Sequence, residues 1–128
     1  MQLVAKLLGV EAGQDAVIRT EMYRQKDKVV WPYNYTVADF SNAISSLRNN
    51  ASHAFVDEGL VVPKYLGAEG MITGNILSAD ADSLAYARTA AQVLATVYGT
   101  GSPSKPGGFY PKGGRGPIAE SYLNTTSS

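Results

Sequence analysis

The residues best suited to metal chemistry lie near the start of the chain, where Glu11 and Gln14 stand three positions apart. On an α-helix this spacing places both side chains on one face. In four-helix carboxylate proteins that bind two iron ions, Glu-x-x-His at this spacing directs two ligands into the bundle. Here Gln stands in place of His, and an amide is a poorer iron ligand than an imidazole. Glu11 and Gln14 are therefore candidate metal ligands, but the interpretation that we favour is that they hydrogen-bond across helices, with Arg19 or another helix supplying partners.

The other residues with chemical potential form weaker patterns. His53 is the single histidine and follows a polar stretch, which favours a solvated loop side chain over a catalytic one. Asp80 and Asp82 resemble the start of a calcium loop, but the Gly and Glu that complete that motif are absent, so an Asp-rich turn is predicted. The chain contains no cysteine, which excludes disulfides, thiolate nucleophiles and cysteine-based zinc sites.

The element that must position Glu11 and Gln14 is a predicted helix over residues 1–28. Its apolar residues recur at helical spacing and form a stripe that also contains Glu11 and Gln14. The stripe consists of Val4, Leu7, Leu8, Ile18 and Met22. No N-capping residue precedes this helix, so we expect an upstream part of it to be absent from this chain, together with any export signal.

Two further helices are predicted after an extended apolar linker over residues 29–33. The first has Thr36 as its N-cap, Asp39 in its first turn and Asn49-Asn50 at its end. Its predicted apolar face consists of Val37, Phe40, Ile44 and Leu47. A capping box of Thr89 and Gln92 predicts the start of the other helix, which runs through Tyr98 and ends at Gly99.

The remaining segments are rich in loops. Residues 51–88 contain short apolar pieces separated by glycines, which is compatible with strands, turns or an extended wrap. Residues 100–117 are rich in Gly and Pro, as in a disordered linker, but Phe109 and Tyr110 favour an arm that packs on a surface, which the sequence does not specify. A short turn over residues 118–123 is expected to precede a frayed end.

Composition narrows the classes of partner. Lys+Arg and Asp+Glu number 11 each, and this zero net charge argues against nucleic-acid binding. The longest apolar run is far too short for a membrane span. Three Asn-x-Ser/Thr sequons begin at Asn34, Asn50 and Asn124, and they are either surface glycosylation sites or chance occurrences.

The chain resembles the C-terminal half of plant desiccation-related proteins, whose N-terminal half is a ferritin-like domain. The likeness extends over most of the chain and is carried by the runs VEAGQDAVIR (10–19), DEGLVVPK (57–64), LGAEG (66–70), ITGNILSAD (72–80), SLAYART (83–89), VYGTG (97–101) and PGGFYPKG (106–113). Runs of this length and unusual composition are more specific than any short motif above.

The resemblance implies a mainly α fold, in which residues 1–28 are the last helix of a truncated ferritin-like four-helix bundle. Residues 29–128 would be a family-specific, loop-rich extension with two shorter helices. Glu11 corresponds to the family's glutamate in that last helix, and Gln14 is the family's usual residue, which implies a degenerate metal site. The family is expected in the apoplast or cell wall. No cofactor is expected for this chain, although iron is an expectation for the full-length family.

Three functions follow as hypotheses. The first is a non-enzymatic, desiccation- or stress-associated protein of ferritin-like ancestry, acting through contacts with wall components or other proteins. The second is a metal-dependent, di-iron-type oxidase half-site that a partner chain or self-association completes. The third is an extracellular wall- or glycan-binding module that uses the arm over residues 100–117. Because three covering helices are missing, the stripe on the first helix is also expected to drive self-association.

Overall fold

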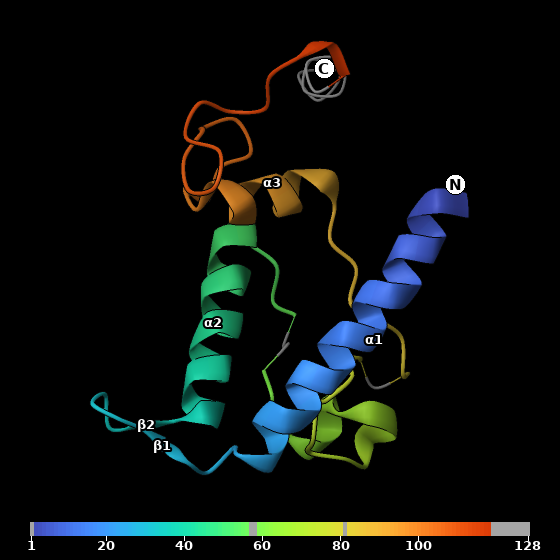
Figure 1. Ribbon diagram of the computed structural model, residues 1–128, viewed down its shortest axis with the longest axis vertical. Helices are drawn as coiled ribbons and strands as arrows, with labels where there is room; N and C mark the ends of the chain where they lie inside the picture. The colour runs from blue at the N-terminus through green and yellow to red at the C-terminus, as the bar shows by residue number, and fades with distance from the viewer. Residues whose placement is uncertain (1, 57–58, 81, 119–128) are drawn as a thin grey trace. The chain divides into compact units, whose positions relative to one another are not determined.

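The computed structural model describes residues 2–56, 59–80 and 82–118 and is mainly helical in that part of the chain, as expected (Figure 1). It contains helices α1 (Gln2–Arg24), α2 (Val37–Ser52) and α3 (Ala90–Tyr98). Strands β1 (Val29–Val30) and β2 (Tyr35–Thr36) form a small antiparallel sheet, and η1 (Lys64–Leu66) and η2 (Ala68–Gly70) are short 3-10 helices. Residues 119–123 of the turn expected over 118–123 and the sequon at Asn124 lie outside the described residues.

The chain divides into two compact units. One comprises Met1–Ser46 and Val56–Tyr86, and the other comprises Leu47–Phe55 and Ala87–Ser128. This spatial division differs in kind from the predicted boundary between residues 28 and 29, which separates an ancestral bundle helix from its extension. That boundary stays a prediction.

Helix α1 packs in the first unit through a face that the apolar pattern did not indicate. Ala16, Arg19, Thr20 and Tyr23 are the buried or half-buried residues of this face, at the i, i+3, i+4, i+7 spacing of one helix side. Tyr23 lies against Gly74, where an added Cβ would approach the Tyr23 hydroxyl to 3.0 Å. Leu7, Leu8 and the rest of the N-terminal half of the stripe are exposed to solvent.

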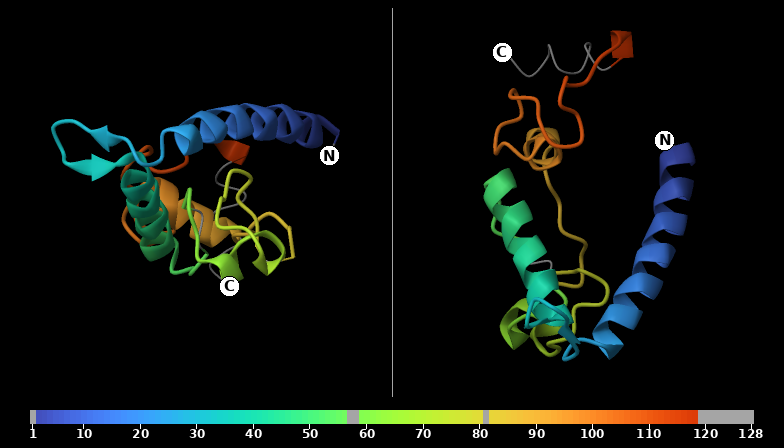
Figure 2. Two further views of the ribbon diagram at one scale, coloured as in Figure 1. Left: turned by 90° about the horizontal axis from the view of Figure 1, so that it is seen from below. Right: turned by 60° about the vertical axis from the view of Figure 1, so that its left-hand side comes forward.

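The predicted extended linker after α1 is instead a β-hairpin. Val29 pairs with Thr36 and Val30 with Tyr35, so the chain reverses direction over residues 31–34. Tyr33 N–H donates to Val30 O at 2.9 Å and closes a turn that contains a cis Trp31-Pro32 peptide bond. The hairpin loop projects from the helix ends that the hairpin connects (Figure 2).

Helix α2 begins where it was predicted but buries its predicted face only in part, since Val37 and Phe40 are half-buried. Ile44 and Leu47 of the predicted apolar face are exposed, whereas Ser41 and Ser45 are buried. Four-residue spacing places these serines on one side of the helix, and their small side chains allow the neighbouring backbone to come close. The helix continues to Ser52, slightly beyond the predicted end at Asn49-Asn50.

Residues 59–80, called the middle segment below, supply the apolar core of the first unit. Leu60 is fully buried and Val62 nearly so. Backbone hydrogen bonds from Val62 N–H to Thr73 O (2.9 Å) and from Asn75 N–H to Leu60 O (3.0 Å) hold the two sides of this segment together. Gly67 is required for the close approach, because a Cβ there would lie 1.7 Å from Ile72 O.

The second unit is organised by α3. Thr89 and Gln92 form the predicted capping box, and Gly99 ends the helix with a left-handed φ of 63°, as predicted. The Gly/Pro-rich arm folds back on this helix, with Phe109 N–H donating to Val97 O at 3.2 Å and Gly114 N–H to the Tyr98 hydroxyl at 3.3 Å. The prediction of a packed arm is confirmed, but its anchor is the buried Tyr98.

The two aromatic residues of the arm itself lie outside. Phe109 is 86% exposed and Tyr110 is also exposed. The close contact is made by backbone instead, since a Cβ on Gly107 would lie 2.7 Å from Tyr98 O and one on Gly108 would lie 2.6 Å from Val97 O. Glycine thus allows the arm to dock through its main chain, which leaves the neighbouring rings free to point away.

Candidate functional site

Helix α1 presents Glu11 and Gln14 together at its surface. Both are exposed, and they lie in a stretch of α1, residues 2–15, that is exposed throughout. In the described residues, Arg19 does not pair with either of them, although the sequence offered it as a partner. Its guanidinium is directed to backbone carbonyls of the middle segment. Glu11 and Gln14 therefore lie on one accessible helix surface, and the part of the chain that the structure describes brings no further ligands to them.

Arg19 is the polar centre of the contact between α1 and the middle segment. Its Nε donates to Ile76 O at 2.9 Å, and its Nη2 donates to Gly59 O at 3.1 Å and to Asn75 O at 2.5 Å. The residue is buried. A buried cation is costly unless its hydrogen bonds are satisfied, and a planar fork of donors suits several converging carbonyls. Arg19 thereby fixes which side of α1 faces the extension.

Asn75 completes this polar cluster from the other side. Its side chain is buried, its Nδ2 donates to Gly59 O at 2.7 Å, and its Oδ1 accepts from Ala79 N–H at 3.3 Å. Gly59 O therefore accepts from both Arg19 and Asn75. The sequence offered Arg19 only as a partner of Glu11 or Gln14 and gave Asn75 no role, because the acceptors of Arg19 are 40 to 57 positions away and the Gly59 carbonyl that Asn75 shares with it is 16 positions away.

Glu11 and Gln14 do not by themselves provide the ligands of an iron site. Among the residues that the structure describes, no three His, Asp or Glu side chains gather where they could hold a metal ion. Glu11 offers a single carboxylate, and Gln14 offers a neutral amide oxygen beside it. A di-iron centre needs carboxylates from several helices. Any metal bound at this surface would take most of its ligands from outside the described residues.

His53 and Asp80 have structural partners in the backbone. His53 follows α2 with a φ of 53°, and its Nε2 lies 3.0 Å from Gly101 O, so the imidazole links the end of α2 to the arm of the second unit. Asp80 Oδ1 accepts from the backbone N–H groups of Asp82 (2.9 Å) and Leu84 (3.0 Å). These contacts confirm the predicted Asp-rich turn in place of a calcium loop.

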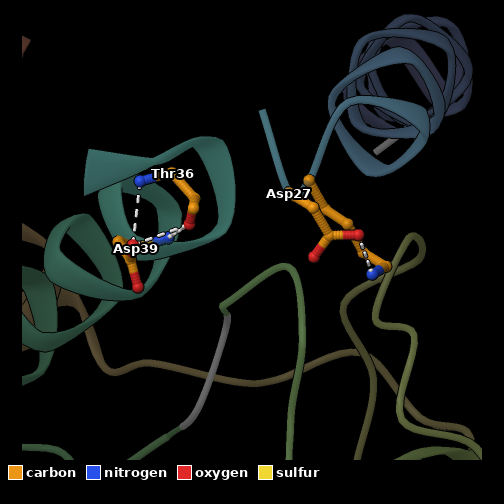
Figure 3. Close-up of polar contacts among 4 residues, drawn as sticks. Asp27, Thr36 and Asp39 are labelled. Atoms are coloured by element: carbon orange, nitrogen blue, oxygen red, sulfur yellow. Dashed lines mark hydrogen bonds and ion pairs between the residues drawn. The ribbon is translucent and has the colours of Figure 1, made fainter. Parts of the chain in front are cut away.

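Two exposed ion or hydrogen-bond pairs flank the hairpin (Figure 3). Thr36 Oγ1 donates to Asp39 Oδ2 at 2.7 Å, Thr36 N–H donates to the same oxygen at 2.8 Å, and Asp39 N–H donates back to Thr36 Oγ1 at 3.1 Å. The Thr36 side-chain and backbone hydrogen bonds lower the pKa of the Asp39 carboxyl. Beside them, Lys26 Nζ donates to Asp27 Oδ2 at 2.5 Å, and this hydrogen bond raises the pKa of Lys26.

Comparison with known proteins identifies relatives over most of this chain. It is 53% identical over 123 residues to ferritin-like catalase Nec2 of Nesocodon mauritianus, a match that covers 95% of the chain and 40% of that protein. It is 47% identical over 112 residues to desiccation-related protein PCC13-62 of Craterostigma plantagineum, covering 87% of the chain and 36% of that protein. The chain is a homologue of part of these ferritin-like, desiccation-related plant proteins. The resemblance in the sequence is thereby confirmed.

The chain spans about two fifths of the length of these curated relatives. No family model matches the chain, and no solved structure does so either. None of the helices in the described residues is long and apolar enough to cross a membrane. The helical architecture and the names of the relatives agree with a fragment of a ferritin-like helical protein.

Proposed function

We propose that this chain belongs to a non-enzymatic, desiccation- or stress-associated protein of ferritin-like ancestry whose metal site is degenerate. The observation that supports the proposal is the pair Glu11 and Gln14, which stands on the accessible surface of α1 with Gln where a second strong ligand is needed. The desiccation-related relative, 47% identical over 112 residues, supports the physiological context. In this view the extension keeps α1 in place through Arg19, and the protein acts through its surfaces.

The test uses the full-length natural protein, because its remaining length is where further ligands would lie. Glu11→Ala is expected to leave peroxide consumption and other redox turnover unchanged, since Glu11 has no chemical role in this proposal. Oxygen release from hydrogen peroxide is the appropriate assay, given the name of the relative at 53% identity. Glu21→Ala, the same change on the same helix, is the matched control. Loss of a measurable turnover in Glu11→Ala alone would contradict the proposal.

A second candidate function is supported by a specific observation. The relative at 53% identity is named a ferritin-like catalase, and Glu11 lies on the side of α1 that does not carry the Arg19 contacts. The alternative is therefore a metal-dependent redox half-site in which α1 supplies one carboxylate and other helices supply the remaining ligands. In the longer protein, or with partner chains, this chain would form one wall of that site.

Thermal unfolding of the full-length protein under anaerobic conditions, with and without ferrous iron, distinguishes the two proposed functions. A ligand that binds only the folded state raises the melting temperature. The first proposal predicts no rise that depends on Glu11, whereas the second predicts a rise in the wild type that Glu11→Ala removes. Gln14→His provides a sharper variant, because it restores the imidazole of the Glu-x-x-His pattern and should strengthen iron binding if the other ligands are present.

A further inference from the structure

The loop between β1 and β2 combines exposed aromatic rings with one of the three sequons. Asn34-Tyr35-Thr36 occupies the tip and second strand of the hairpin. Trp31 is 88% exposed, Tyr33 63% and Tyr35 61%. Exposed rings of this size offer apolar surface to a ligand, and here the same few residues contain an acceptor for a sugar chain. The proposed function on α1 uses none of these residues.

Asn34 is presented in a way that leaves its amide accessible. Its backbone has a φ of 60°, a left-handed conformation that Asn tolerates better than most residues and that is common at turns. The side chain is exposed, and the loop projects from the helix ends (Figure 2). Tyr35, the residue between Asn34 and Thr36, is not proline, so the sequon is a valid acceptor.

The rings around Asn34 are held in place from α2. Tyr33 and Tyr35, which flank Asn34, both meet the Phe40 ring edge to face, at centroid distances of 5.7 Å and 6.2 Å and interplanar angles of 81° and 80°. The capping contacts between Thr36 and Asp39 fix the start of that helix. Because the rings are already ordered, they lose little additional freedom when a sugar packs on them.

We propose that Asn34 is an N-glycosylation site and that the first sugar of its glycan packs on the exposed aromatic rings of the hairpin. In the modification step, the Asn34 amide nitrogen attacks the anomeric carbon of a lipid diphosphate-linked oligosaccharide. An N–C bond forms, the bond from that carbon to the diphosphate oxygen breaks, the lipid diphosphate leaves, and the amide proton passes to a base on the transferring enzyme. The glycan then covers apolar ring surface that is otherwise exposed.

The sequon at Asn50 provides a comparison within the same chain. Asn50 lies in the last turns of α2, and its hydroxyl residue Ser52 is 3% exposed. Ser52 Oγ donates to Asn49 O at 3.3 Å and accepts from Arg88 Nε at 3.3 Å. No aromatic residue flanks Asn50, since its neighbours are Asn49 and Ala51. We therefore assign Asn34, and not Asn50, as the preferred acceptor.

The first experiment examines the natural protein purified from its source tissue. Its peptides are treated with a peptide N-glycosidase active on plant glycans in ¹⁸O-labelled water, which converts a glycosylated Asn to labelled Asp, and are then analysed by mass spectrometry. The expected result is label at Asn34 with less or none at Asn50. An unmodified Asn34 peptide, whether or not Asn50 carries label, overturns the proposal.

The second experiment tests the packing of the sugar on the rings. The full-length protein is secreted from plant cells as wild type and as Tyr33→Ala, a change that keeps the sequon. Each is melted before and after enzymatic removal of the glycan. Deglycosylation is expected to lower the melting temperature of the wild type, and the decrease is expected to be smaller in Tyr33→Ala. An equal decrease in both proteins, or none in the wild type, overturns the packing. Asn50→Gln is the control and is expected to behave as the wild type.

Discussion

A single side chain, Arg19, decides how α1 is used in the first unit. Its guanidinium reaches carbonyl oxygens of Gly59, Asn75 and Ile76, which come from a segment that is otherwise held together by backbone hydrogen bonds. A charged residue is an unusual choice for a buried contact, and here the partial negative charges of peptide oxygens accept its donors. Because the donors of the guanidinium lie in one plane, these hydrogen bonds fix both the rotation of α1 about its axis and its position along that axis relative to the three carbonyls.

Replacing Arg19 by Met should destabilise the first unit. The substitution retains much of the apolar stem but leaves buried carbonyls without a donor, at about 1–3 kcal/mol for each one that water does not reach. Arg19→Lys should recover only part of the loss, because an ammonium lacks the planar fork. Urea unfolding followed by circular dichroism measures the effect. Arg24→Met, an exposed arginine on the same helix, is the control and should change stability little.

The Thr36–Asp39 pair allows a prediction about pH. The hydrogen bonds from the Thr36 side chain and backbone hold the pKa of Asp39 below its ordinary value of 3.8. A depressed carboxyl pKa contributes stability that is present above the unfolded-state value and is lost as the pH falls through the folded-state value. Thr36→Val removes the side-chain hydrogen bond, so it should raise the pKa of Asp39 toward 3.8.

The measurement is a carboxyl ¹³C NMR titration of Asp39 in both proteins. If Asp39 titrates at the same pH in Thr36→Val and in the wild type, the cap is not the cause of the shift.

At the scale of elements, local signals in the sequence identified helix ends better than helix faces. Thr36 with Asp39, Thr89 with Gln92, and Gly99 were all predicted, because capping depends on residues within one turn. The hairpin was missed because its loop contains Trp31-Pro32-Tyr33-Asn34 and lacks the Asn-Gly or Asp-Gly pair that marks short hairpins.

The buried faces could not be read from periodicity. The apolar face predicted for α2 includes Ile44 and Leu47, but among the described residues of that helix Ser41 and Ser45 are buried instead. On α1 the N-terminal half of the stripe is exposed, as expected for a chain without the covering helices, and the buried residue is Arg19. Periodicity shows that a face avoids water; it does not show which partner covers it. The same limit applies to the candidate site, where Glu11 and Gln14 were placed on one helix face from their spacing, while the role of Arg19 depends on distant carbonyls.

Two glycines should respond in opposite ways to substitution by Ala. Gly67→Ala should disrupt the middle segment, because the new Cβ would meet Ile72 O at 1.7 Å and force the backbone apart. Gly13→Ala should stabilise α1 by about 0.5–1 kcal/mol, because Ala restricts the unfolded chain and nothing lies within 4 Å of the added carbon. Urea midpoints of the two variants provide the test, and a lower midpoint for Gly13→Ala would show that α1 is packed more closely at that point.

At the scale of the whole molecule, the chain buries few apolar residues. Among the described residues, the buried hydrophobic side chains are Leu60, Val62, Ala95 and Tyr98, whereas long apolar side chains on α1 and α2 remain exposed. A chain of this length ordinarily buries a larger core. The exposed apolar surface on α1 is continuous along the N-terminal half of the helix. The zero net charge of the chain provides little repulsion between copies.

We therefore predict that the isolated 128-residue chain self-associates through the stripe on α1. Leu8→Lys places a charge in the stripe and should shift the chain toward monomer, because burying an unpaired ammonium in an apolar contact is costly. Gln2→Lys adds the same charge at an exposed position on the opposite side of the helix and should leave association unchanged. Light scattering coupled to size-exclusion chromatography, over a series of concentrations, measures the average mass of each protein. A wild-type chain that is monomeric throughout, or an equal effect of both lysines, would show that the stripe does not mediate contacts between copies. In that case the stripe would be left uncovered in the isolated chain, as a surface that a longer protein could cover with other helices.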